Sequence, residues 1–133
     1  HKIAKSYVDK LDNSNKIYIT EIIQLVREAE NAIISNNLND FGKLLHESWL
    51  LKKELSSSIS NSRIDTIYNT AIRNGALGGK LLGAGGGGFL LLYVPQKYQT
   101  KLIKKLGKLI TIPFNFSSEG SKIMFKNIED KLI

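Results

Sequence analysis

The stretch 75–88 reads Gly75-Ala76-Leu77-Gly78-Gly79-Lys80-Leu81-Leu82-Gly83-Ala84-Gly85-Gly86-Gly87-Gly88 and holds most of the chain's 11 glycines. Glycine loses more backbone freedom on folding than any other residue, so a dense run is costly unless the fold uses it. Such a run supplies positive φ angles, or bare backbone close to a ligand. N–H groups that converge from a glycine loop form an anion site, and phosphate is the usual ligand. The stretch therefore indicates a phosphate-binding loop; the alternative is a glycine-rich hairpin against which a neighbouring segment packs closely.

Short strands are expected on both sides of this loop, at about 80–82 and 89–94. The second strand is apolar throughout, so we expect both of its faces to be covered. A Walker loop ends in Gly-Lys-Ser/Thr and leads into a helix, and the dinucleotide fingerprint also opens a helix. Here Gly88 is followed by Phe89 and a strand. Both of these phosphate-binding motifs are therefore excluded.

Apolar residues at helical spacing predict three helices before the loop, over about 17–35, 38–57 and 62–74. Asn37 is expected to cap the second helix, with Asp40 in its first turn. Ser62 followed by Asp65 resembles a capping box for the third helix. Gly75 suits the left-handed position that ends it.

A fourth helix is expected after Pro95, followed by strands at about 110–116 and 121–126. The buried stripe of that helix is predicted to be Tyr98, Leu102, Leu106 and Leu109.

The order of these elements predicts an α+β fold, with an antiparallel sheet and helices packed on one of its faces. A strand–helix–strand step across Leu91, Leu102 and Ile112 would form a split β-α-β unit of the ferredoxin-like kind. The 133 residues are expected to form a single domain, helical over about 1–75 and α/β over about 76–133.

Composition narrows the classes of function. The chain has no Cys and 2 His, His1 and His46, which excludes thiolate chemistry and a histidine-rich metal site. We expect His46 to be a partly buried helix residue. The longest apolar run, 89–94, is far shorter than the ~20 residues that span a bilayer. We expect a cytoplasmic protein without a membrane partner.

The formal net charge is +7, and five lysines recur at helical spacing on one predicted helix face: Lys97, Lys101, Lys104, Lys105 and Lys108. A solvated helix face is the ordinary interpretation. Nucleic acid or an acidic membrane is the functional alternative. Nucleic acid is the weaker interpretation, because the lysine face lacks the aromatic residues on which single-stranded bases stack.

The segment 79–89 resembles the third sequence motif of the GHMP kinases, which reads Lys-x-Thr/Ser-Gly-Ala-Gly-x-Gly-Gly on a hairpin of their C-terminal domain. The spacing agrees from Lys80 to Gly88. Leu82 departs from the pattern, since many members have a hydroxyl residue there. The segments 46–53, 64–68 and 75–80 are similar to the branch that phosphorylates D-glycero-D-manno-heptose 7-phosphate.

The resemblance implies the C-terminal domain of an ATP-dependent sugar kinase that transfers the γ-phosphoryl group to a hydroxyl of a heptose 7-phosphate or related sugar phosphate. In this family the loop around the ATP phosphates, the usual catalytic acidic residue and the Mg²⁺ ligands lie in the N-terminal domain. This sequence contains no such loop and does not begin with Met. We therefore expect an inactive fragment without catalytic or metal-binding residues, whose partner is the N-terminal domain of the same protein. A homo-oligomer is left open.

The resemblance and the residue types together give the candidate binding residues. Lys80, Lys52 and Lys53 are candidates for binding phosphate, and an exposed lysine is the alternative for each. Trp49 is a candidate for stacking on a sugar, with a core position as the alternative. The candidate backbone donors to phosphate are Gly83, Ala84, Gly85, Gly86 and Gly87.

Two other functions fit the residues. One is a stand-alone ferredoxin-like module that binds a small anion with the same loop. The other is a nucleic-acid-binding domain that uses the lysine face, whose binding would weaken steeply with salt.

Overall fold

The computed structural model describes residues 13–114 and 119–121. The expected strand at 121–126 lies outside this part except for residue 121, which is not in a strand. The elements in chain order are α2 (Asn13–Ile34), α3 (Leu38–Glu54), α4 (Ser62–Arg73), β1 (Gly78–Leu82), β2 (Phe89–Tyr93) and α5 (Gln96–Lys105).

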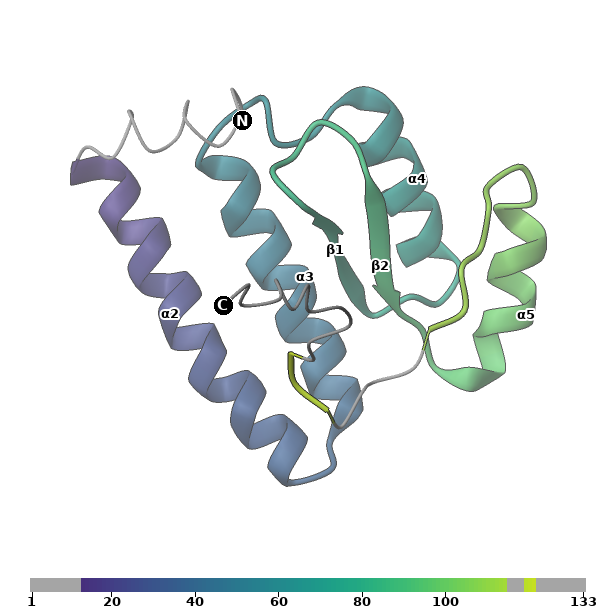
Figure 1. Cartoon of the computed structure of the whole chain (residues 1–133), viewed down its shortest axis with the longest axis horizontal. Helices are drawn as coiled ribbons and strands as arrows, with labels where there is room; N and C mark the ends of the chain where they lie inside the picture. The colour runs from purple at the N-terminus through teal and green to yellow at the C-terminus, as the bar shows by residue number, and fades with distance from the viewer. Residues whose placement is uncertain (1–12, 115–118, 122–133) are drawn as a thin grey trace, which may run out of the picture.

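The first two described helices form a pair that lies beside the hairpin (Figure 1). Asn36 has a positive φ of 55° and turns the chain at the end of α2. The side chain of Asn37 accepts a hydrogen bond from the backbone N–H of Asp40. This confirms the predicted cap, which satisfies one of the free N–H groups at the start of α3.

The cap of α4 differs from the prediction. Asn61 occupies the N-cap position with extended backbone, and its Oδ1 accepts from the N–H of Ile64 at 3.0 Å. Ser62 is already helical, so the predicted capping box with Asp65 is wrong. Asn and Ser cap equally well, and Asn61 has the non-helical backbone that a cap needs. The helix ends as predicted, with Gly75 at a φ of 103°.

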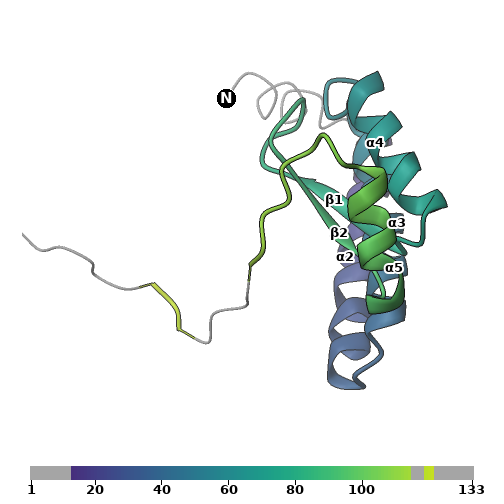
Figure 2. The ribbon, with the colours of Figure 1, turned by 90° about the vertical axis from the view of Figure 1, so that its right-hand side faces the viewer.

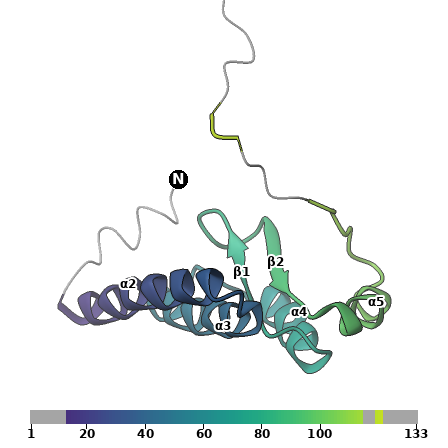
Figure 3. The ribbon, with the colours of Figure 1, turned by 90° about the horizontal axis from the view of Figure 1, so that it is seen from below.

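The hairpin of β1 and β2 is antiparallel, with Lys80 opposite Leu91 and Leu82 opposite Phe89. Figures 2 and 3 show α3 and α4 on one side of it. Phe89 is 64% exposed, so the expectation that both faces of this strand are covered is wrong within the described residues. The α+β class itself is confirmed.

The core joins these two layers. Its main cluster consists of Trp49 from α3, Tyr68 from α4, Leu81 from β1 and Ile59 from the α3–α4 connection, all buried. A second cluster combines Ala71, Ala76 and Leu102 and holds α5 against the end of α4.

The end of the described chain departs from the predicted sheet. Residues 110–114 form no strand, and Ile112 is 53% exposed, so the third strand of the expected β-α-β step is absent there. Leu102 is buried as predicted, whereas Tyr98 and Leu109 are exposed. An apolar alternation does not hold a strand unless a neighbouring strand accepts its hydrogen bonds. Helix α5 ends at Lys105, so Lys108 lies beyond the helix that was expected to carry all five lysines.

Candidate functional site

The glycine loop connects β1 directly to β2, as the sequence predicts. Four of its glycines have positive φ angles: Gly83 (98°), Gly85 (114°), Gly86 (74°) and Gly88 (120°). L-residues with side chains rarely adopt these conformations, which explains why the run is glycine.

One side of the loop is fixed to the α3–α4 connection. The N–H of Gly86 donates to the carbonyl of Ile59 at 3.0 Å, and Nδ2 of Asn61 donates to the carbonyl of Gly86 at 3.2 Å. A Cβ on Gly85 would lie 2.9 Å from the Cα of Ile59. The predicted role of Gly86 as a donor to phosphate is therefore wrong in this conformation, because the protein itself accepts its N–H.

The other side of the loop is open. Gly83 and Gly87 are exposed, and nothing lies within 4 Å of the Cβ that either could carry. Within residues 13–114 and 119–121, no protein acceptor pairs with the N–H of Gly85 or Gly87. Unpaired N–H groups on bare backbone are what an anion site requires.

The structure separates the two neighbouring lysines of α3. Lys52 is half-buried and points its Nζ at the carbonyl of Gly83, 3.4 Å away. Lys53 forms a salt bridge of 3.3 Å with Asp65 and lies 5.9 Å from the ring centroid of Trp49. Only Lys52 therefore belongs to the loop, and Lys53 ties α3 to α4.

Lys80 joins Lys52 near the beginning of the loop. Residues two apart on a strand share a face, and a Cβ on Gly78 would meet Gly42 and His46 of α3, so Lys80 is on the face of β1 that adjoins this helix. Burial, and then the charge of Lys80, lower the pKa of Lys52. The two lysines thus come from α3 and from the face of β1 that adjoins it.

The core beside the loop contains a series of hydrogen-bonded polar groups that the sequence did not predict. Nδ1 of His46 and the hydroxyl of Tyr68 share a hydrogen bond of 2.8 Å, and their rings are stacked. That hydroxyl also lies 3.5 Å from the carbonyl of Gly79, to which it donates. Burial raises the pKa of Tyr68 to about 12, so the phenol stays protonated at neutral pH. These hydrogen bonds link α3 and α4 to β1. His46 is partly buried, as expected.

Trp49 is fully buried, and within the described residues its Nε1 has no hydrogen-bond partner. The ring is therefore a core group and is not available for stacking on a sugar.

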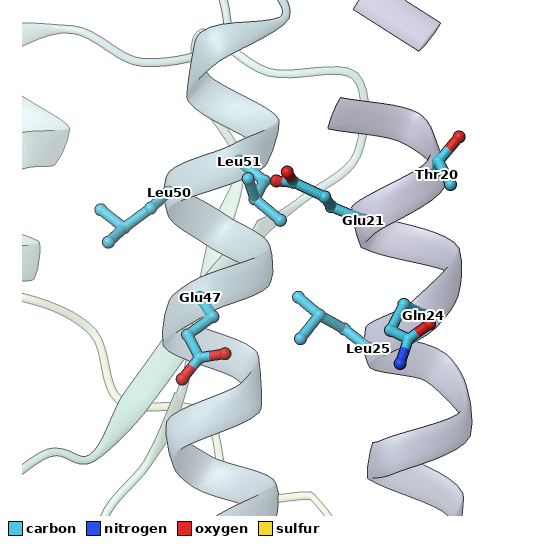
Figure 4. Close-up of a pocket in the computed structure, with 7 residues that line it drawn as sticks. All are labelled: Thr20, Glu21, Gln24, Leu25, Glu47, Leu50 and Leu51. Atoms are coloured by element: carbon cyan, nitrogen blue, oxygen red, sulfur yellow. The ribbon is translucent and has the colours of Figure 1, made fainter. Parts of the chain in front are cut away.

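A groove lies elsewhere, between α2 and α3 (Figure 4), and is lined by Thr20, Glu21, Gln24, Leu25, Glu47, Leu50 and Leu51. Figure 4 shows Leu25 and Leu51 between the two helices. None of the predicted binding residues lines the groove, and its two carboxylates disfavour phosphate.

The described residues do not bring together three His, Asp or Glu side chains that could hold a metal ion. No helix in the part of the chain that the structure describes is long and apolar enough to cross a bilayer.

Comparison with known protein families identifies the domain that contains this hairpin. The model of the C-terminal domain of GHMP kinases matches residues 22–110, which include α3, α4, the glycine loop and α5. The chain belongs to the GHMP kinase C-terminal domain family. This confirms the resemblance that the glycine motif indicated.

Several relatives of this GHMP kinase domain are kinases of small molecules. D-glycero-alpha-D-manno-heptose 7-phosphate kinase of Campylobacter jejuni is 43% identical over 88 residues, covering 62% of this chain and 26% of that protein. Mevalonate kinase of Methanocaldococcus jannaschii is 41% identical over 69 residues, covering 52% of this chain and 21% of that protein. The GHMP chain thus spans about a quarter of the length of these relatives.

A solved structure has the same fold. Mevalonate kinase of L. major, in complex with R-mevalonate, superposes with a TM-score of 0.70 at 22% identity, covering 80% of the GHMP chain and 32% of its own. At this identity the likeness concerns the fold alone.

The sequence did not predict that Asn61 holds the glycine loop of this GHMP domain, because the cap of α4 was assigned to Ser62.

Asn61→Ser tests this role of Asn61. Serine keeps the cap but is too short to reach Gly86, so stability should change by about 0.5 kcal/mol or less while activity of the full-length protein falls roughly tenfold. Urea unfolding and steady-state kinetics measure the two effects. Asn69→Ser, at an exposed position of the same helix, is the control. Unchanged activity in a stable Asn61→Ser protein would contradict the role.

Proposed function

We propose that the full-length protein is an ATP-dependent kinase that transfers the γ-phosphoryl group to a hydroxyl of a heptose 7-phosphate or a related sugar phosphate. The observation that carries the proposal is the glycine loop, which is fixed on one side by Ile59 and Asn61 and open on the other at Gly83 and Gly87. Membership of the GHMP kinase family supports the reaction class. The similarity to the heptose 7-phosphate kinase of Campylobacter jejuni supports the substrate class.

Phosphoryl transfer depends on positioning and on stabilising the charge that spreads over the phosphoryl oxygens. The N–H groups of Gly85 and Gly87 are donors already held in place, so they need no rearrangement when that charge develops. The hydrogen bond from Gly86 to Ile59 keeps the loop in this shape. ATP supplies the phosphoryl group, and Mg²⁺ neutralises phosphate charge when it is bound.

This domain supplies only one wall of such a site. We propose that the N-terminal kinase domain of the same protein provides the ATP loop, the acidic residue and the Mg²⁺ ligands, so the domain by itself is inactive. A cytoplasmic location follows from this proposal, because ATP and sugar phosphates are cytoplasmic metabolites.

The direct test is ADP production by the full-length protein with Mg²⁺, ATP and a panel of heptose and hexose phosphates. We expect turnover with D-glycero-D-manno-heptose 7-phosphate or a close analogue. A folded full-length protein that turns over ATP with none of the panel would overturn the proposal.

Gly87→Ala separates a ligand-binding role from a structural one. Gly87 has an ordinary φ and free space where a methyl group would lie, so the fold should accept alanine without loss of stability. If substrate approaches the bare backbone here, activity should fall roughly tenfold or more. Steady-state kinetics with a thermal unfolding control measures this. Wild-type turnover by Gly87→Ala would mean that no substrate comes close to this backbone.

A further inference from the structure

We propose that Lys52 and Lys80 together bind the phosphate that the acceptor sugar already carries, and so select phosphorylated acceptors over free sugars. This inference rests on the proposed function and adds to it two residues that determine which acceptor is bound.

The fold brings the two side chains together from different elements. Lys52 lies in the last turn of α3, and its Nζ is 3.4 Å from the carbonyl of Gly83. Lys80 lies on β1, three residues before Gly83 in the chain, on the same face as Gly78, where a Cβ would meet Gly42 and His46 of α3. Both side chains therefore belong to elements that adjoin the beginning of the glycine loop, on the side of α3.

The charges of this pair are not balanced. Salt bridges in the described residues join Lys43 to Asp40 and Lys53 to Asp65, and neither includes Lys52 or Lys80. Lys52 is half-buried, and both its burial and the charge of Lys80 lower its pKa. Two like charges without a carboxylate are unfavourable, whereas a dianionic phosphate between them would be stabilised by both.

The position of the pair favours the acceptor's phosphate over the transferred phosphoryl group. Lys52 reaches the carbonyl of Gly83 at the beginning of the loop, and Lys80 lies on the strand that leads into it, whereas the unpaired N–H groups lie further along at Gly85 and Gly87. A sugar phosphate places a phosphate at one end and its reacting hydroxyl at another. Lysine charges at one point and backbone donors at another match a ligand of this kind.

The surroundings also favour a sugar phosphate. Leu82 and Phe89 form a cross-strand pair beside the loop and are 42% and 64% exposed. An apolar wall next to a charged pair suits the carbon skeleton of a sugar, and it lowers the local dielectric around the phosphate.

The test compares D-glycero-D-manno-heptose 7-phosphate with the unphosphorylated heptose in the full-length protein. Lys52→Met keeps the length of the side chain and removes its charge. It should raise both the Kd and the KM for the heptose 7-phosphate about 10- to 100-fold, because a charge-assisted hydrogen bond is lost. Binding of the unphosphorylated heptose and the KM for ATP should stay within about threefold of wild type. Lys80→Met should have an effect in the same direction.

Lys43→Met is the matched control, because Lys43 lies on the same helix, is exposed and pairs with Asp40. It should leave unchanged the Kd and KM for heptose 7-phosphate, the Kd for the unphosphorylated heptose and the KM for ATP. Calorimetry of sugar binding without ATP gives the Kd values, and thermal unfolding verifies that each variant is folded.

The outcomes separate this inference from the proposed function. If Lys52→Met weakens both sugars equally, or raises the KM for ATP instead, the inference is overturned while the kinase function stands. It is also overturned if the wild-type protein binds the two sugars equally well. If the wild type binds heptose 7-phosphate through Lys52 but never phosphorylates it, the inference stands and the proposed function fails.

Discussion

Gly85→Val in the full-length protein should lower phosphoryl transfer by at least about 100-fold while the domain remains folded. Gly85 has a φ of 114°, which valine disfavours strongly. Its Cβ would lie 2.9 Å from the Cα and 3.1 Å from the carbonyl oxygen of Ile59, and backbone atoms cannot move aside as a flexible side chain can. The loop must therefore shift away from the α3–α4 connection and carry the N–H groups of Gly85 and Gly87 with it.

The measurement is kcat with saturating ATP and sugar phosphate, beside far-UV circular dichroism and a thermal unfolding curve. Gly85→Ala adds one methyl group at the same site and should have an intermediate effect. The fold should survive, because Gly85 belongs to neither core cluster. Wild-type turnover by a folded Gly85→Val protein would show that the loop is only structural.

Trp49→Ala should have the largest effect on stability, lowering the free energy of unfolding by about 3–5 kcal/mol. The Trp49 ring is fully buried among Ile59, Tyr68 and Leu81, so the substitution removes apolar contacts and leaves a cavity between α3, α4 and β1. Urea unfolding followed by circular dichroism measures the change.

Two further variants sharpen this prediction. Trp49→Phe loses volume but also removes Nε1, which has no partner in the described residues, so its cost should be clearly smaller than that of alanine. Leu50→Ala, at the next position of α3, removes a side chain that is 43% exposed and should cost less than about 1 kcal/mol. Equal costs for Trp49→Ala and Leu50→Ala would mean that Trp49 is not the centre of the core.

The parts of the fold that local sequence determines could be predicted. The cap at Asn37, the left-handed stop at Gly75 and the positive φ angles of the loop each depend on residues a few positions apart. The helices followed from the spacing of apolar residues in the same way. The stretch 110–114 could not be predicted by these means, because a strand needs a partner and the pattern of one segment does not supply it.

The position of the glycine loop between two strands was predicted, whereas the contacts around it depend on segments that are distant in sequence. Lys52 and Lys53 are adjacent in sequence and differ by about 100° around the helix axis. One faces the glycine loop and the other faces Asp65 only because of where β1 and α4 pack. The same reason applies to Gly86, whose N–H is taken by Ile59, a residue that nothing in the glycine motif indicates.

Asn61 has a consequence for how variants of this protein are interpreted. Its Oδ1 accepts from the N–H of Ile64 at the start of α4 and its Nδ2 donates to the carbonyl of Gly86, so one amide group supports both a helix end and the glycine loop. A substitution that removes the whole amide would therefore disturb the start of α4 and the glycine loop at the same time. Separating the two effects requires a substitution that keeps the acceptor for the N–H of Ile64 and removes the donor to the carbonyl of Gly86.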